Sequence, residues 1–567
     1  MNPFDKKLNR RNFMGLIGGS CAIIGAASIV PRSAAAQRRG PPPLRHGRNT
    51  KVKKNASEGS LTEVTTDVLV VGGGMAGVFA AVKAHDAGAN VILVDKGAVG
   101  KSGQTPFARG IFRYDEKETG MSKSEYLAQT ADAAEQMNNP PYTKLMLNDG
   151  PARIDELKSW GFFDELGYAK AMNHPLNERN ITVYERVTLT NLLKLNGRVV
   201  GAMGMYIDQN ESLVIHAKSV ILCTGASGFK PSGWQIGSLT SDGDAMAYRI
   251  GAEISGKEWV DGHSRSNGGL EGTNRIESSS HISPMLGVEE NVEVEKNGPG
   301  GSMMMGPPPG AGDKKGHPMG PPPGSDGDDR RGPPPGGGGN GAGPTLMGGA
   351  SAGMSQHKAE GLFPADDKCA SSIPGLYAAG DSLCSMQSGG IYTQTGSSLV
   401  GSAAQGAVAG TSAADYSKSV SLVKTTDRAL KQINTDIYAP FLRDRGFSPQ
   451  WVTQALQGIM IPNFILYVKS EDRLLAALTY IEYLRDHQVP LLMADDLHEL
   501  RQCHETANMV LNAEMKLRAS LMRKETRGSH YREDYPDRND AEWLCWIKIK
   551  QGSNGGMELV KHPIKQV

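Results

Sequence analysis

Three glycines and an aspartate have the spacing of a site that binds a pyrophosphate. Gly72, Gly74 and Gly77 form a G-x-G-x-x-G motif, and Asp95 follows them at about the 20-residue distance that this motif requires. Such glycines let the backbone approach a pyrophosphate at the N-terminus of a helix, where the helix dipole favours negative charge. An acidic residue at this distance can accept a hydrogen bond from an adenosine ribose hydroxyl.

The segments on either side of these glycines have the pattern that the motif needs. TDVLVVGGG predicts a buried strand that enters the glycine turn, MAGVFAAVKAHDAG predicts a helix, and NVILVD predicts the next strand. The glycine spacing alone is weak evidence, but between a strand and a helix it is strong. Further strands are expected between 181 and 225, with a turn at Asn196-Gly197, and helices after Asp415. The fold class is therefore α/β.

Two more strand-to-turn segments favour FAD over NAD as the bound dinucleotide. AKSVILCTG enters a Thr-Gly turn at 224–225, and IPGLYAAGDS ends in Gly-Asp at 380–381. Together with the glycine motif, they resemble the three separated FAD contacts of flavoproteins that have two dinucleotide-binding folds.

More closely, the chain resembles the fumarate reductase/succinate dehydrogenase flavoprotein superfamily, which includes adenylylsulfate reductase. The matching segments include DVLVVGGGMAGVFAAVKAHDAGANVILVDKG, TSDGDAMAYRIGAEI and RKETRGSHYREDYPDRNDAEW, and they run from about residue 65 to 550 with an interruption near 265–345. The segment DLHELRQCHE is similar to adenylylsulfate reductase. The resemblance implies a Rossmann-like FAD domain of the two-dinucleotide-binding type, a reduced Gly/Pro-rich capping region and a helical C-terminal domain.

The domain boundaries follow from composition and from this resemblance. The predicted order is a signal peptide at 1–36, a flexible leader at 37–60, the first part of the FAD domain at 61–263, the cap at 264–345, the second part of the FAD domain at 346–415 and the helical domain at 416–567. Within the cap, 297–344 is of low complexity and repeats MGPPPG and RGPPPG. Without the strict G-X-Y period of collagen, this insert is expected to be polyproline-like or disordered.

The resemblance also implies which residues hold FAD. Gly72, Gly74, Gly77, Asp95 and Lys96 would hold the ADP part, and the other expected contacts are Ser102, Gly103, Gln104, Thr105, Gly110, Val187, Thr224, Gly225, Asp242, Asp381, Ser397, Ser398 and Leu399. Respiratory members attach FAD to a histidine in an S-H-T sequence, whereas this chain reads KSGQTPFARG. FAD is therefore expected to bind non-covalently.

A long segment near this site, the uncharged segment, contains no side chain that is ordinarily charged at neutral pH. Between Asp381 and Asp415 there is no Asp, Glu, Lys, Arg or His. The family's substrate-binding arginine falls in the stretch 389–393, which has no cation, and its histidine before T-M-G-G aligns with Pro344. Because charge-assisted hydrogen bonds contribute about 1.5–3 kcal/mol each, a site without them holds a dicarboxylate poorly. An uncharged or weakly polar substrate is expected instead of succinate or fumarate.

Three side chains are candidates for the chemistry on the substrate. His263 aligns with the histidine of the family's F-H-P-T segment and could bind a substrate oxygen or transfer a proton. Arg265 and Tyr392 are weaker candidates, as a cation or a phenol near the flavin ring. For all three the alternative is a structural role. The charged segment 523–543 is interpreted as mostly structural, because the family uses a similar segment to join the helical domain to the FAD domain.

The N-terminus has the features of a twin-arginine export signal. Arg10, Arg11 and Phe13 precede a moderately apolar run, which Pro31 follows, and Ala34-Ala35-Ala36 supplies small residues for cleavage. The run is short and glycine-broken, so no stable membrane span is expected. The protein is predicted to be periplasmic.

Composition and cysteine spacing limit the partners. The formal net charge of the 567 residues is +1, so nucleic-acid binding is not expected. The five cysteines after the signal form no C-x-x-C pair, which predicts buried free thiols and no metal centre. The substrate is then a small molecule, and an iron–sulfur protein or a quinone is the possible electron partner. The alternatives are an electron-transferring flavoprotein subunit beside an iron–sulfur protein, and a non-catalytic FAD-loaded scaffold.

Overall fold

The computed structural model describes residues 45–46, 59–107, 111–163, 168–230, 236–260, 281–282, 354–391 and 396–564. The chain divides into two compact units, Met1–Leu44 and Arg45–Val567, and every described residue belongs to the second. The predicted signal peptide, most of the leader and cap, and the site candidates Gly110, His263, Arg265 and Tyr392 lie outside the described residues.

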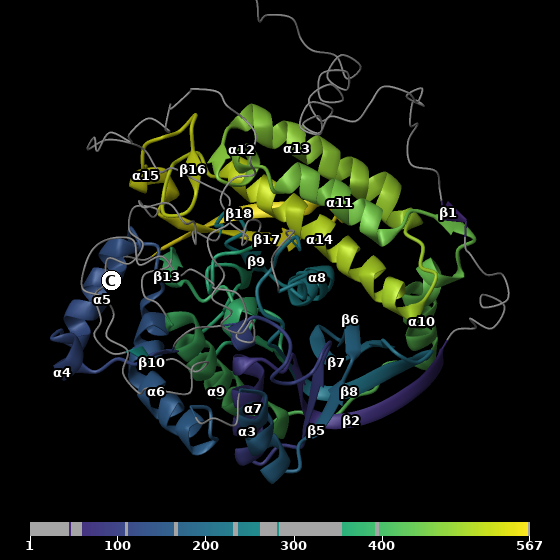
Figure 1. Ribbon diagram of the computed structural model, residues 1–567, viewed down its shortest axis with the longest axis horizontal. Helices are drawn as coiled ribbons and strands as arrows, with labels where there is room; N and C mark the ends of the chain where they lie inside the picture. Colours follow the sequence, from purple (N-terminus) through teal and green to yellow (C-terminus); the bar gives the residue numbers. More distant parts are fainter. Residues whose placement is uncertain are drawn as a thin grey trace, which may run out of the picture. The chain divides into compact units, whose positions relative to one another are not determined.

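A mixed sheet of seven strands is the centre of the α/β part (Figure 1). The strands β5 (Thr182–Glu185), β3 (Val91–Asp95), β2 (Ser60–Val71) and β8 (Glu211–Leu222) lie side by side and parallel, and β12 (Leu376–Ala378) joins β8 in parallel. β7 (Arg198–Tyr206) and β6 (Val187–Leu195) extend the sheet in antiparallel orientation. The turn expected at Asn196-Gly197 connects these two strands, and both of its residues have positive φ angles.

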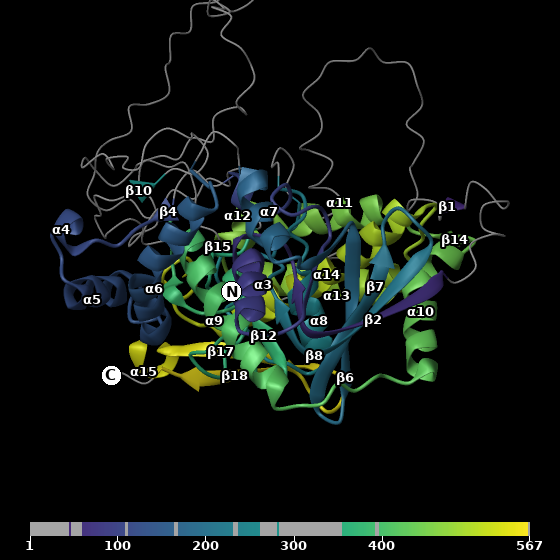
Figure 2. The same ribbon diagram turned by 90° about the horizontal axis from the view of Figure 1, so that it is seen from below.

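Two helices pack closely on this sheet and on each other. They are α3 (Met75–Asp86) and α9 (Ser397–Lys418), which lie side by side in both views (Figures 1 and 2). A Cβ atom at Gly406 or Gly410 would lie 2.2 or 2.3 Å from a carbonyl oxygen of α3. The small side chains of the uncharged segment are therefore required, at least in part, by this helix contact.

The C-terminal region is helical, as predicted, and then returns to the α/β part. Its main helices are α10 (Asp427–Leu442), α11 (Pro449–Met460), α13 (Glu471–Tyr483) and α14 (Leu497–Met522). They bury a second core around residues such as Leu456, Leu474 and Leu500. Helices were predicted after Asp415, and apolar periodicity along 474–521 predicted those at α13 and α14.

The end of the chain is a β-hairpin that the sequence analysis did not predict. Its strands β17 (Cys545–Gln551) and β18 (Met557–Pro563) belong to a sheet of order β11-β9-β17-β18, with β9 at Ile254–Ser255 and β11 at Gly361–Leu362. Cys545, Ile547 and Ile549 are buried at every second position, which is the pattern of a half-buried strand. This hairpin lies within 416–567, which was predicted to be a helical domain.

The remaining elements are short or lie at the edges. The helices are α4 (Glu116–Thr119), α5 (Lys123–Ala133), α6 (Pro140–Ser159), α7 (Tyr168–Glu178), α8 (Asp242–Arg249), α12 (Asn463–Leu466) and α15 (Asp540–Trp543), with single turns η1 (Thr105–Phe107), η2 (Gly380–Ser382), η3 (Leu484–Gln488) and η4 (Val489–Leu491). The strands are β1 (Arg45–His46), β4 (Ile111–Phe112), β10 (His281–Ile282), β13 (Gln387–Gly390), β14 (Arg445–Gly446), β15 (Val468–Lys469) and β16 (Tyr531–Arg532). Within the described ranges, no helix has the length and apolar character needed to cross a membrane.

Buried ion pairs join the C-terminal region to the α/β part. The guanidinium of Arg523 lies 3.0 Å from Glu258 and 2.7 Å from Glu525, and all three side chains are fully buried. Lys257 contacts Asp244 at 2.5 Å and Glu360 at 3.1 Å, and Lys516 of α14 also contacts Glu360. These contacts agree with the structural interpretation of the charged segment 523–543.

Candidate active site

The glycine turn leaves a space at the N-terminus of α3. Gly72 has φ = +106°, and a Cβ atom at Gly77 would lie 1.8 Å from its carbonyl oxygen, so both positions require glycine for the strand-to-helix packing. At Gly74 the nearest atom to an added Cβ is the Thr105 hydroxyl, 3.6 Å away. The first N–H groups of an α-helix have no partner within the helix. This turn therefore fits the pyrophosphate of FAD.

Asp95 lies below this turn at the carboxyl end of β3. Its carboxylate accepts hydrogen bonds from the backbone N–H groups of Gly73 at 2.7 Å and Gly97 at 2.6 Å. The hydroxyl of Ser102 donates to the same carboxylate at 2.8 Å. The structure thus brings Asp95 and Ser102 together with the glycine motif, while Thr105 lies near the start of α3, where its hydroxyl accepts from the Met75 N–H at 3.4 Å.

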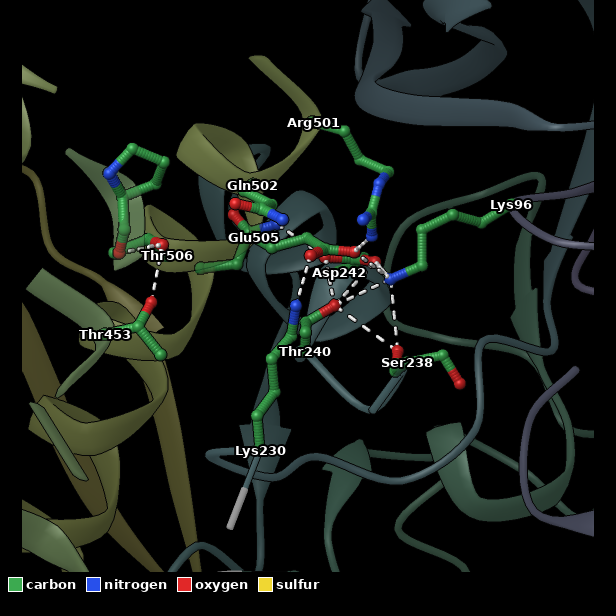
Figure 3. A network of polar contacts seen from close by, with 12 residues as sticks. Lys96, Lys230, Ser238, Thr240, Asp242, Thr453, Arg501, Gln502, Glu505 and Thr506 are labelled. Atoms are coloured by element: carbon green, nitrogen blue, oxygen red, sulfur yellow. Dashed lines mark hydrogen bonds and ion pairs between the residues drawn. The ribbon is translucent and has the colours of Figure 1, made fainter. Parts of the chain in front are cut away.

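Lys96 and Asp242 meet in a network of polar side chains (Figure 3). The ammonium group of Lys96 donates to Asp242 at 2.7 Å and to the Thr240 hydroxyl at 2.8 Å. It also lies 2.8 Å from Glu505, which comes from α14. The sequence analysis predicted Lys96 and Asp242 as cofactor contacts. It missed Glu505, because nothing in the sequence context of Glu505 indicates a partner so far away along the chain.

Glu505 is surrounded by cations. Besides Lys96, Lys230 lies 2.5 Å from its carboxylate, and Arg501 lies one helical turn away and contacts it as well (Figure 3). Burial alone would raise the pKa of Glu505, but the three neighbouring cations lower it to about 2. The carboxylate is therefore ionised at neutral pH and holds Lys96 next to Asp242.

The other predicted contacts lie at the ends of neighbouring strands. Thr224 and Gly225 follow β8, and a Cβ atom at Gly243 would lie 2.2 Å from the Thr224 hydroxyl, so this turn packs against the start of α8. Val187 is the first residue of β6 and is buried. The turns after β2, β3, β8 and β12 thus bring the predicted residues to one edge of the parallel strands, where α/β folds bind dinucleotides. Gly103 and Gln104 lie in the described loop before η1.

A cation that the sequence analysis did not predict lies against the start of α9. The ammonium group of Lys358 contacts Asp381 and donates to the hydroxyls of Ser402 at 2.7 Å and Ser398 at 3.3 Å. Nδ1 of His357 lies 2.9 Å from the other oxygen of Asp381. Lys358 thus brings an ammonium group to the uncharged segment, and the sequence analysis identified neither this lysine nor His357.

This cation is already neutralised by its partner. Lys358 is 2 % exposed, and Asp381 is 10 % exposed. Burial alone would raise the pKa of Asp381, but Lys358 and His357 hold it well below its usual range. Burial lowers the pKa of Lys358, and Asp381 opposes this effect. The two side chains form a buried ion pair beside Ser398 and close to Ser397 and Leu399.

The described ends of the segments that carry the candidate catalytic residues lie near each other. The hydroxyl of Ser529 accepts a hydrogen bond from the Val260 N–H at 3.3 Å, and the Ser529 N–H donates to the carbonyl of Gly390 at 3.1 Å. Val260 precedes His263 by three residues and Gly390 precedes Tyr392 by two. The described chain on both sides of the candidates is thus fixed to the same loop of the C-terminal region.

The cysteines that the structure describes are free thiols. The described cysteines Cys223, Cys369, Cys384, Cys503 and Cys545 are all free and buried, which confirms the prediction of buried free thiols. Burial raises the pKa of Cys369 to about 12. No group of three or more His, Cys, Asp or Glu side chains suited to a metal ion occurs among the described residues.

Two protein families match this chain. The family described as FAD binding domain matches residues 67–170 and 162–261. The family described as fumarate reductase flavoprotein C-term matches residues 453–566. The first match contains the glycine turn, Asp95, Lys96 and Asp242, and the second contains Glu505 and Ser529.

Two curated proteins are similar to the chain over most of their length. An uncharacterized FAD-dependent oxidoreductase of Methanocaldococcus jannaschii is 24% identical over 86% of this chain and 96% of its own. One subunit of the fumarate reductase (CoM/CoB) of Methanothermobacter marburgensis is 24% identical over 86% of this chain and 97% of its own.

The fold is similar to that of known flavoprotein structures. Adenylylsulfate reductase from Archaeoglobus fulgidus superimposes with a TM-score of 0.65 at 18% identity, and the match covers 93% of this chain and 99% of that chain. At this identity the similarity shows the fold alone.

Proposed function

Because the chain belongs to the fumarate reductase/succinate dehydrogenase flavoprotein superfamily and is an FAD-dependent oxidoreductase, we propose that it exchanges a hydride between flavin N5 and an uncharged or weakly polar organic substrate. FAD supplies the two-electron chemistry. The glycine turn, Asp95 and Lys96 would hold its ADP part, and Asp381 with the start of α9 would hold the flavin end. His263 is the leading polar partner for the substrate, with Arg265 and Tyr392 behind it.

The lack of charged residues in the uncharged segment is the main support for this proposal. Residues 382–414 contain no Asp, Glu, Lys, Arg or His, and the one lysine in contact with Ser398 and Ser402 is paired with Asp381 and buried. A cation that is already paired adds little charge-assisted hydrogen bonding for a substrate carboxylate. An activated alkene, an alcohol or a cyclic ketone meets this requirement better than a dicarboxylate.

The first experiment tests the substrate class directly. The FAD-loaded protein is reduced anaerobically, and reoxidation of the flavin is followed by absorbance after addition of fumarate, neutral enones or quinones. We expect reoxidation by a neutral acceptor at least tenfold faster than by fumarate at equal concentration. Fast reoxidation by fumarate would overturn the proposed substrate class, and no response to any acceptor would favour the scaffold interpretation or a missing partner.

Non-covalent attachment of FAD is part of the proposal. The segment KSGQTPFARG has no histidine in place of the family's S-H-T sequence. Denaturation with acid, followed by centrifugation, is expected to leave the yellow colour in the supernatant. Flavin fluorescence that stays with the precipitated protein would contradict it.

A second candidate function is that of a flavoprotein subunit in a larger complex. The similarity to a protein named as a subunit, over 97% of that protein, favours it. The partner would then be an iron–sulfur protein or a quinone-binding protein. Co-purification of an iron–sulfur protein with the tagged chain from its native host would support this alternative, whereas rapid turnover of the isolated chain with a neutral acceptor would argue against it.

We also propose export through the twin-arginine pathway to the periplasm. Arg10-Arg11, the apolar run and Ala34-Ala35-Ala36 support it. Replacing both arginines by lysine is expected to keep the precursor in the cytoplasmic fraction of the host. Processing and periplasmic recovery of the twin-lysine variant equal to those of the parent chain would contradict this route.

A further inference from the structure

Lys358 is held in place by its backbone as well as by its side chain. It has φ = +63°, a left-handed backbone conformation that residues other than glycine rarely adopt. Its carbonyl oxygen accepts a hydrogen bond from the Met386 N–H at 2.8 Å, while its ammonium group contacts Asp381 and two serines of α9. A strained backbone that positions a buried charge is typical of a functional site.

The partners of Lys358 are the residues expected at the flavin. Asp381 and Ser398 belong to the predicted FAD contacts, and Ser402 follows Ser398 by one helical turn of α9. The N-terminus of α9 and the ammonium group of Lys358 are both positive, and the carboxylate of Asp381 is negative. The charge at this position is therefore set mainly by Lys358 and Asp381, and His357, whose Nδ1 lies 2.9 Å from Asp381, is the third group of this cluster.

We propose that Lys358 is a positioning residue that sets the reduction potential of the bound FAD by neutralising Asp381. This inference rests on the proposed function, because it requires FAD in the site assigned above. Reduction places negative charge on the flavin. With Lys358 present, the adjacent ion pair has no net charge, and without it Asp381 would repel the reduced flavin.

Opposite charge changes at the two positions test this proposal. The midpoint potential of the FAD-loaded protein is measured by spectroelectrochemistry for Lys358→Met, Asp381→Asn and the double variant. We expect Lys358→Met to lower the ratio of reduced to oxidised flavin at fixed potential about tenfold, which is 29.6 mV for a two-electron couple. Asp381→Asn is expected to raise this ratio, and the double variant is expected to lie near the parent protein.

The matched control keeps the charge and changes the shape. For Lys358→Arg, the ratio of reduced to oxidised flavin at the same fixed potential is expected to stay within a factor of two of the ratio in the parent protein. The proposal is wrong if Lys358→Met and Asp381→Asn shift the potential in the same direction. It is also wrong if neither variant changes the ratio of reduced to oxidised flavin more than twofold. Because Lys358→Met leaves a carboxylate without its main partner, thermal unfolding of each variant is measured alongside, and the double variant restores neutrality if the single variant is poorly folded.

The potential and the substrate test fail independently. A protein that no neutral acceptor reoxidises would overturn the proposed substrate class and leave the charge dependence of the potential intact. A midpoint potential that changes with neither substitution would overturn the role of Lys358 and leave the substrate test unchanged. A protein that retains no FAD at all would contradict the assigned cofactor site, and with it both proposals.

Discussion

His504 of α14 is a side chain whose protonation the fold opposes. One ring nitrogen, Nε2, lies 2.9 Å from the carbonyl oxygen of Ile437, so the ring donates there as a neutral imidazole. Burial lowers the pKa of His504 to about 4, and the nearby Arg249 acts in the same direction. In the unfolded chain the same group titrates near 6.5.

This difference in pKa predicts acid sensitivity. Between pH 6.5 and 4 the unfolded chain binds more protons at this position than the folded chain does, so stability is lost as the pH falls through this window. We expect His504→Gln to remove up to about 3 kcal/mol of this loss, since 1.36 kcal/mol corresponds to each pKa unit. Urea unfolding at pH 7 and pH 4.5 measures it. The exposed His498→Gln on the same helix is the control, and an equal change in both variants would contradict the assignment.

At the scale of single residues, the sequence indicated which residues belong to the site but did not indicate which side chains they contact. The sequence indicated Lys96 and Asp242 as members of one site because each belongs to a local motif. Glu505 and Lys358 have no such motif. Glu505 reaches Lys96 only through packing of α14, and Lys358 reaches Asp381 only through its left-handed backbone conformation. Long-range electrostatic pairs of this kind leave no periodic signal in a sequence.

The contact between α3 and α9 depends on glycine at the crossing. A Cβ atom at Gly406 would lie 2.2 Å from the carbonyl oxygen of Ala76. Gly458 in α11 has no atom within 4 Å of the same added position, and it is exposed. These two glycines are both helical and differ mainly in what surrounds them.

Gly406→Ala and Gly458→Ala are therefore expected to change stability in opposite directions. Overpacking at Gly406 is expected to cost about 1–3 kcal/mol, because the helices must separate. At Gly458 the better helix propensity of alanine is expected to stabilise by roughly 0.5–1 kcal/mol. Chemical denaturation of both variants measures this, and stabilisation by Gly406→Ala would show that the contact between the helices is looser than described.

At the scale of elements, local patterns predicted most of the fold. The glycine turn, the strands of the sheet and the helices of the C-terminal region follow from apolar periodicity and turn residues. The hairpin β17–β18 was missed although Ile547 and Ile549 alternate with Lys548 and Lys550 and a Gly-rich turn follows. The sequence analysis assigned the whole of 416–567 to the helical domain.

Arg523 connects the end of α14 to the segment after β9. Its guanidinium donates to Glu258 at 3.0 Å, to Glu525 at 2.7 Å and to the carbonyl oxygens of Trp543 and Cys545. Segments far apart in the chain are thus joined by one fully buried side chain. A buried charge without its partner is expensive, since water cannot replace the lost contact.

Arg523→Met is accordingly expected to destabilise the whole protein by about 3–5 kcal/mol, because the buried Glu258 loses its ion-pair partner and the buried Glu525 keeps only Arg527. Arg538→Met, which removes an exposed pair with Asp540, is expected to change stability by about 0–1 kcal/mol. Urea unfolding followed by tryptophan fluorescence, together with FAD retention on gel filtration, distinguishes the two. Similar losses in both variants would show that the buried pair does not join the two parts as described.

The order of strands in the central sheet affects how the protein is made. β8 lies between β2 and β12, so the residues that frame the cofactor edge leave the ribosome at widely separated times, and the start of α9 at Ser397 leaves last. At about 5–20 residues per second, translation reaches this point roughly 20–80 s after initiation. During most of that time the glycine turn exists without its covering helix. The proposed FAD site can therefore be completed only late in synthesis, after non-local strand pairing, which is a slow kind of folding step.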